Sequence, residues 1–185
     1  MTLTPLFTAT QIRERVEALA QQIATASLKP DIALPVLAGS FVFAADLLRA
    51  LATRGLSLPM EFIWLRSYGT KREGREVTVL VGPPEELHGR TALLIDGVLD
   101  RGHTLARAHA LLLERGATTV LTAVAVDKAR TDAAFRADYA AFINVSDFIV
   151  GYGMDEASRH RGLPYIARAE ATPSAPESGR ADRPR

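Results

Sequence analysis

Residues 93–108 read LLIDGVLDRGHTLARA, and this stretch decides the fold. An apolar strand leads to the acidic residues Asp96 and Asp100, and a helix follows a short turn. In an open parallel sheet, ligands bind at the carboxyl ends of the strands. Backbone N–H groups of the turn and the positive end of the helix dipole can hold a phosphate, and a carboxylate can accept hydrogen bonds from sugar hydroxyls. The stretch therefore predicts a site for a phosphorylated sugar, although an ordinary turn capped by Asp has the same pattern. The residues of this turn are Arg101, Gly102, His103 and Thr104.

The segments on either side alternate between strands and helices. Thr8 and Gln11 form a capping-box pattern ahead of a helix expected over residues 10–25. Strand, helix and strand in succession indicate parallel crossovers, and hence an α/β protein with a mostly parallel central sheet flanked by helices. The other expected helices cover residues 41–55 and 104–116, and the expected strands lie in residues 32–38, 61–69, 77–82, 91–96, 119–128, 138–143, 147–153 and 164–169.

The composition excludes several classes of protein. The 22 basic and 21 acidic residues leave a net charge of +1, which argues against a surface for nucleic acid or for a membrane. Without cysteine there is no disulfide, thiolate nucleophile or cysteine-bound zinc. No segment reaches the roughly 18 apolar residues of a membrane span, and we expect a cytoplasmic protein. We expect one domain over residues 1–170 and a disordered tail over residues 171–185, which have three prolines and no Leu, Ile, Val or aromatic residue.

Five segments in order give the chain a resemblance to a known family. Asp96 to Thr104 is similar to the signature of type I phosphoribosyltransferases, in which two acids and two aliphatic residues precede Asp-Thr-Gly, any residue and Thr. The remaining segments resemble those of hypoxanthine-guanine phosphoribosyltransferases, and the resemblance extends over residues 10–168. It implies the type I phosphoribosyltransferase fold, with a small hood built from the N- and C-terminal parts of the folded body. The four other segments are residues 36–51, 66–70, 127–128 and 147–166.

The resemblance implies an enzyme that uses Mg²⁺ to join a purine to the ribose 5-phosphate of phosphoribosyl pyrophosphate (PRPP), releasing pyrophosphate. It implies that residues 101–104 hold the 5-phosphate and that Asp96 holds the ribose hydroxyls or their Mg²⁺. Asp100 becomes the general base near the purine, where a carboxylate can take a proton or stabilise developing charge. It also implies a pyrophosphate loop with a cis peptide bond, a pyrophosphate contact from Arg161, and a mobile loop that closes over the site. The pyrophosphate loop is Leu37, Ala38 and Gly39, and the mobile loop begins at Ser67 and Tyr68.

Four further residues are implied to bind the purine. Lys128 would donate to the exocyclic oxygen of a 6-oxopurine, which separates hypoxanthine and guanine from adenine. It is one of only three lysines in the chain, against 19 arginines. Phe148 would stack on the ring, Ile149 would offer backbone contacts to its edge, and Asp155 would hold Mg²⁺ or meet the base edge. Aromatic and aliphatic residues in this segment could equally belong to the core. The resemblance further implies a homodimer or homotetramer.

The chain departs from the family pattern at three positions. Gly97 stands for the second acid, Arg101 for a threonine, and Ala38 for the lysine of the pyrophosphate loop. We expect Gly97→Asp to tighten PRPP binding by supplying the missing carboxylate, unless the backbone requires glycine. A protein that senses PRPP or a nucleotide without catalysis is the alternative to a purine-salvage enzyme that makes IMP or GMP. Because Asp100, Lys128, Asp155 and Arg161 are all kept, we favour the enzyme.

Overall fold

The computed structural model describes residues 2–68, 76–85 and 87–170. The expected tail (171–185) and nearly all of the polar segment that links two of the expected strands (69–75) lie outside these residues. None of the described helices is long and apolar enough to span a membrane.

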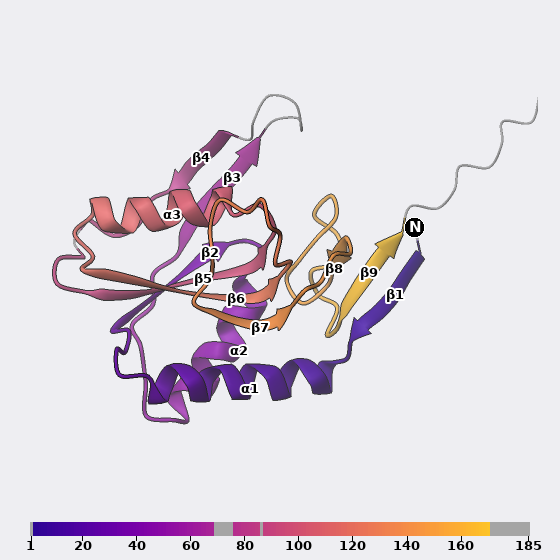
Figure 1. Ribbon diagram of the computed structural model, residues 1–185, viewed down its shortest axis with the longest axis horizontal. Helices are drawn as coiled ribbons and strands as arrows, with labels where there is room; N and C mark the ends of the chain where they lie inside the picture. The colour runs from indigo at the N-terminus through magenta and orange to yellow at the C-terminus, as the bar shows by residue number, and fades with distance from the viewer. Residues whose placement is uncertain (1, 69–75, 86, 171–185) are drawn as a thin grey trace, which may run out of the picture.

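A six-stranded sheet forms the centre of the molecule (Figure 1). Its strand order is β4-β3-β2-β5-β6-β7, in which neighbouring strands run parallel except for β4, which pairs antiparallel to β3 at one edge. The mostly parallel α/β sheet predicted from the sequence is therefore confirmed. The strands are β2 (Ile32–Leu37), β3 (Ile63–Tyr68), β4 (Glu76–Val81), β5 (Thr91–Leu99), β6 (Thr119–Asp127) and β7 (Tyr139–Ile143).

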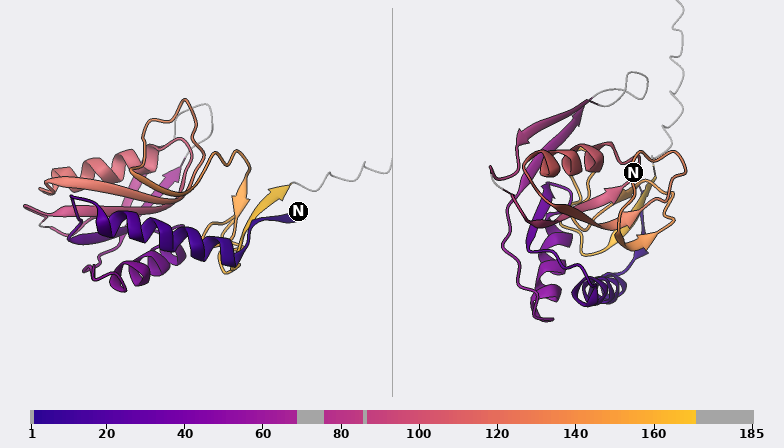
Figure 2. Two further views of the ribbon diagram at one scale, coloured as in Figure 1. Left: turned by 60° about the horizontal axis from the view of Figure 1, so that its bottom comes forward. Right: turned by 60° about the vertical axis from the view of Figure 1, so that its left-hand side comes forward.

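Helices cover both faces of this sheet (Figures 1 and 2). Helices α1 (Ala9–Thr25) and α2 (Phe41–Ala52) pack on one face, and α3 (His103–Glu114) packs on the other. Successive residues of β5 point to opposite faces, so Leu93 contacts the first pair of helices while Leu94 lies in the core beneath α3. The sheet is thus buried on both sides, which explains its long apolar strands.

A second, three-stranded sheet forms the hood beside the carboxyl ends of the parallel strands (Figure 1). It consists of β1 (Thr2–Phe7), β9 (Ile166–Glu170) and β8 (Ile149–Val150), all antiparallel to their neighbours. Its assembly from the two ends of the described chain agrees with the expected hood. The sequence analysis had not predicted β1, because Pro5 and four threonines in the first ten residues give no clear apolar alternation. As an edge strand, β1 tolerates a residue without an N–H group.

Strand β5 is longer than predicted, because Gly97, Val98 and Leu99 continue it instead of forming a turn. Val98 and Leu99 pair with Val126 and Asp127 of β6. Asp96 consequently lies inside the strand, and Asp100 is the first residue beyond it. Glycine inside a strand often marks the close approach of another backbone, and a loop near this position is described below.

Candidate active site

Asp100 and Lys128 leave the sheet side by side. Strands β5 and β6 end level with each other, where Leu99 pairs with Asp127, and the Lys128 N–H donates to the Leu99 carbonyl at 2.9 Å. The Lys128 Nζ lies 3.9 Å from Asp100 Oδ2. The lysine side chain is only 12% exposed, whereas that of Asp100 is 50% exposed. The structure therefore brings together the predicted base and the predicted purine ligand, with the carboxylate open to solvent.

The turn after Asp100 has the backbone shape that a phosphate loop requires. Gly102 adopts a left-handed conformation (φ 80°) as the N-cap of α3. A Cβ at this position would lie 2.7 Å from the Cβ of Phe135, so the residue must be glycine for two reasons. The Ala134 N–H donates to the Arg101 carbonyl at 2.8 Å, which ties the loop after β6 to this turn. The first N–H groups of α3 point out of the helix at its positive end, where an anion is stabilised.

Asp96 is a partly buried carboxylate within the same strand. Its Oδ1 accepts a hydrogen bond from the Gly97 N–H at 2.7 Å. Burial raises its pKa from 3.8 to about 7, although this hydrogen bond partly opposes the rise. Near neutral pH, Asp96 can therefore accept a hydrogen bond as a carboxylate or donate one as an acid, and both suit a sugar hydroxyl.

The predicted pyrophosphate loop follows β2 and contacts both β5 and the hood. The peptide bond between Leu37 and Ala38 is cis, as the resemblance implied. A Cβ on Gly97 would lie 2.7 Å from the Gly39 carbonyl oxygen, and a Cβ on Gly153 would lie 2.6 Å from it. This carbonyl is therefore enclosed between two glycines. The structure thus gives a reason against the expected benefit of Gly97→Asp, since an added side chain meets a backbone oxygen.

The predicted purine residues of the hood segment differ in exposure. Phe148 is 52% exposed, so the alternative that it belongs to the core is wrong. Ile149 is 5% exposed and does belong to the core, but a backbone contact to a purine would not need its side chain outside. Phe148 directly precedes β8 of the hood, and an exposed phenylalanine could stack on a planar base.

Asp155 and Arg161 form an ion pair with each other. Arg161 Nη2 lies 2.7 Å from Asp155 Oδ1, and Arg161 Nη1 donates to the Gly153 carbonyl at 2.6 Å. The other oxygen of Asp155 accepts the Ser158 N–H at 2.7 Å. Both predicted residues therefore lie in the segment that follows β8, where Gly153 connects them to the pyrophosphate loop.

The predicted residues Ser67 and Tyr68 are the last two residues of β3. The chain that follows them lies outside the described residues, so the closing of a mobile loop stays a prediction.

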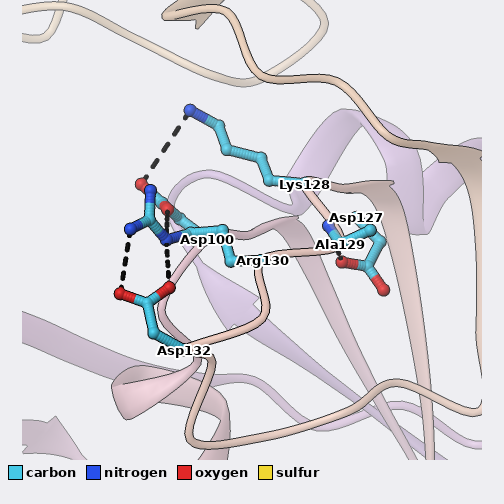
Figure 3. Close-up of polar contacts among 6 residues, drawn as sticks. All are labelled: Asp100, Asp127, Lys128, Ala129, Arg130 and Asp132. Atoms are coloured by element: carbon cyan, nitrogen blue, oxygen red, sulfur yellow. Dashed lines mark hydrogen bonds and ion pairs between the residues drawn. The ribbon is translucent and has the colours of Figure 1, made fainter.

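The structure also identifies two charged residues that the sequence analysis missed. Arg130 Nε lies 3.5 Å from Asp100 Oδ1 and 2.8 Å from Asp132 Oδ1 (Figure 3). Arg130 stands two residues after Lys128 in the sequence, but nothing there showed which carboxylate it would contact.

This fold and this set of residues define a class of protein. Residues 6–157 match the phosphoribosyl transferase domain family, which is most of the chain, and the chain belongs to that family. Individual members of the family that are similar to this chain carry the names of more specific activities. The chain is 32% identical to the hypoxanthine-guanine phosphoribosyltransferase of Dictyostelium discoideum, with 87% of this chain and 92% of the relative covered. It is 30% identical to the hypoxanthine phosphoribosyltransferase of Escherichia coli, with 85% and 90% covered.

Two further comparisons concern a longer protein and a solved structure. The bifunctional protein TilS/HprT of Listeria innocua is 33% identical over 165 residues, and the chain spans 25% of that protein's length. The crystal structure of the hypoxanthine phosphoribosyltransferase of Trypanosoma cruzi superposes with a TM-score of 0.78 at 30% identity, covering 90% of this chain and 97% of that one.

Proposed function

We propose that this protein is a cytoplasmic enzyme of purine salvage that transfers the phosphoribosyl group of PRPP to hypoxanthine, and also to guanine, giving IMP or GMP and pyrophosphate. The observation that carries the proposal is the pairing of Asp100 with Lys128 at the ends of β5 and β6, directly before the glycine turn of α3. Relatives that are similar over most of their length carry the names of the same activity.

The phosphate and ribose of PRPP fit the β5 side of the site. The 5-phosphate would accept hydrogen bonds from the backbone of residues 101–104 at the positive end of α3. Asp96 would bind the ribose hydroxyls beside it. Arg101, which replaces the usual threonine, adds a guanidinium that can pair with phosphate and offset part of the charge lost at Ala38. The pyrophosphate group would then lie over residues 37–39, with Arg161 near it.

The purine fits between the hood and the end of β6. Lys128 would donate to the 6-oxo group, while Phe148 stacks on the ring and the backbone of Ile149 contacts its edge. Asp155 would meet the same edge. As the bond from ribose C1 to pyrophosphate breaks and the new C–N bond forms, the purine ring N–H proton would pass to Asp100. Adenine has an amino group in place of the 6-oxo group and would leave the buried lysine without an acceptor, which disfavours adenine.

The residues present fit a Mg²⁺ ion that arrives with PRPP. Mg²⁺ prefers oxygen ligands, and is usually held by one or two carboxylates together with substrate phosphates. Asp96 is suitably placed in the site, whereas both oxygens of Asp155 already have partners in Arg161 and Ser158. The described residues contain no cluster of three or more potential protein ligands. We propose that Asp96 holds Mg²⁺, which would neutralise charge on the leaving pyrophosphate.

A steady-state assay with PRPP and Mg²⁺ tests the proposal against the sensor alternative, which Gly97 and Ala38 favour. Purified protein is incubated with hypoxanthine, guanine, xanthine or adenine, and nucleotide and pyrophosphate are both measured. We expect IMP from hypoxanthine and a strong preference for 6-oxopurines. PRPP binding without nucleotide from any base would refute the enzyme and favour the sensor. Lys128→Gln, with Lys29→Gln as a control of equal charge at an exposed position, checks which lysine matters.

We propose that the protein assembles into a homodimer or homotetramer and does not bind nucleic acid. Edge strand β4 exposes apolar side chains, with Leu80 45% exposed and Val81 50% exposed. Phe62, which directly precedes β3, is 40% exposed. Exposed apolar residues on an edge strand favour association between chains. In the hypoxanthine phosphoribosyl transferase of Trypanosoma cruzi, the C-terminal region has a role in the oligomeric state and the enzymatic activity. Light scattering after size-exclusion chromatography measures the mass directly, and a monomer at micromolar concentration would refute the assembly.

A further inference from the structure

We propose that Arg130 is a positioning residue for Asp100, and that it decides which oxygen of the carboxylate faces the purine. The inference rests on the proposed function. Figure 3 shows the guanidinium of Arg130 between the carboxylates of Asp100 and Asp132, with Lys128 on the other side of Asp100. Its role would be to act through Asp100, without touching the substrate.

The two oxygens of Asp100 have different cationic partners. Oδ1 lies 3.5 Å from Arg130 Nε, and Oδ2 lies 3.9 Å from Lys128 Nζ. When a 6-oxopurine binds, its exocyclic oxygen draws the Lys128 ammonium toward itself, and Oδ2 loses that partner. Oδ1 keeps Arg130. The oxygen released toward the base is therefore Oδ2, which becomes the acceptor for the ring N–H proton.

Asp132 holds Arg130 in place while this happens. Arg130 Nε and Nη2 donate to the two oxygens of Asp132 at 2.8 and 2.9 Å, a two-bond geometry that fixes the plane of the guanidinium. The pKa of Asp132 is lowered, mainly by the hydrogen bond from Arg130, so the carboxylate stays charged at neutral pH. The side chains of both residues are partly exposed to solvent, at 39% and 55%. Exposed ion pairs usually add little to stability, and the consequence of this two-bond geometry that concerns the site is that it fixes the direction in which Arg130 faces Asp100.

The backbone around Arg130 is arranged to bring it back toward Asp100. Ala129 has a positive φ of 50°, and its N–H donates to Asp127 Oδ1 at 2.7 Å. This positive φ and this hydrogen bond fix the backbone directly after Lys128, where β6 has ended. The Ala134 N–H then bonds to the Arg101 carbonyl at 2.8 Å, so the segment is connected to the turn that follows Asp100. Arg130 and Asp100 are thereby held by two loops that are bonded to each other.

A double-mutant cycle in the full chain tests whether Arg130 acts through Asp100. Arg130→Gln should lower kcat for IMP formation by about tenfold, while KM for PRPP changes by less than about threefold. A tenfold loss lies at the low end of the range for removing a contact to a charged group, because this contact is partly exposed. In an Asp100→Asn background, the same substitution should have almost no further effect, because neutral Asn no longer needs orienting. Arg130→Lys, which keeps the charge without the planar fork, should recover part of kcat.

A control and a second measurement separate this role from a loss of structure. Arg136→Gln removes the same charge from an exposed position in the same loop and should leave kcat and melting temperature unchanged. Asp132→Asn should reproduce part of the Arg130→Gln defect with no change in PRPP binding. Losses that add fully in the Asp100→Asn background, or a change confined to KM for PRPP, would overturn the role of Arg130. A parent protein without transferase activity would overturn the proposed function itself, and this inference with it.

Discussion

A methyl group at Gly97 should destabilise the protein and disturb PRPP binding. Its Cβ would lie 2.7 Å from the Gly39 carbonyl oxygen and 3.1 Å from the carbonyl carbon, whereas close C–H···O contacts in proteins have C···O distances of about 3.3 Å or more. One of the two backbones must therefore move by roughly 0.6 Å. Strand β5 is hydrogen-bonded on both sides, to β2 and β6, so the loop after β2 should move.

The expected size of the effect follows from this displacement. Overpacking of a rigid contact typically costs about 1 to 3 kcal/mol, which lowers the melting temperature of a domain of this size by about 2 to 12 °C. Because the displaced loop is the predicted pyrophosphate site, we also expect PRPP to bind several-fold more weakly, since small misplacements in a site have large effects. Gly97→Asp should share both defects. Its new carboxylate would not compensate while the Cβ occupies the place of a carbonyl.

Thermal melts and calorimetric titration of PRPP with Mg²⁺ measure both effects. Gly39→Ala is the matched stability control from the other side of the contact, because a Cβ there meets nothing within 4 Å. Its melting temperature should equal that of the parent. A Gly97→Ala protein that melts within about 1 °C of the parent, together with tighter PRPP binding by Gly97→Asp, would refute the steric argument, because 1 °C corresponds to well under 1 kcal/mol.

Three other substitutions address the chemistry of the site. Asp100→Asn should keep the melting temperature and lower turnover by about 10² to 10⁴, the usual scale for a lost general base, and turnover within a few-fold of the parent would remove Asp100 from that role. Lys128→Gln should lower kcat/KM for hypoxanthine by about 10 to 100-fold, because a buried donor to the substrate is lost, while titrations show PRPP affinity retained. Equal losses of kcat/KM for adenine would contradict the role of Lys128. The pKa of Asp96 is about 7 in the folded protein, above its ordinary value of 3.8. Between about pH 4 and pH 7 the folded protein therefore binds more protons than the unfolded chain. Its free energy of unfolding consequently falls as the pH rises from about 4 to 7. Chemical unfolding in metal-free buffer measures this effect. At pH 8 the Asp96→Asn protein should be more stable than the parent by up to about 4 kcal/mol, and at pH 4 the two proteins should differ little. Equal differences at both pH values would contradict the raised pKa.

Local signals predicted much of the fold. The capping box at Thr8 and Gln11 is present, with Oγ1 of Thr8 accepting the Gln11 N–H at 3.3 Å, and α1 begins one residue before the predicted start. Strand β1 was also hard to predict because its partner, β9, lies at the other end of the described residues. Pairing between such distant segments leaves no trace in a short window of sequence.

Some features of the candidate site could be predicted from the sequence, and others could not. Asp100 and Lys128 were both expected in the site through the family resemblance. The structure shows that they lie side by side because β5 and β6 end level with each other. The contact between Arg130 and Asp100 depends on a loop with a positive φ at Ala129, and alanine rarely adopts positive φ. The role of Gly97 was read as a missing ligand, because nothing in the sequence shows that the Gly39 carbonyl occupies the space of its side chain.

The hood has a consequence for how the protein is made. Its central strand β9 begins at Ile166, so β1 and β8 must both wait until nearly the whole folded chain has left the ribosome before they find a partner. The parallel strands and their helices can assemble earlier, because all of them end by Ile143. A growing chain therefore completes the central sheet with the predicted phosphate loop first, and the segment that carries Phe148 and Ile149, two of the predicted purine residues, last. During that interval we expect the apolar residues of β8, which are buried in the finished fold, to be exposed, and this makes the late intermediate the state most in need of protection from aggregation.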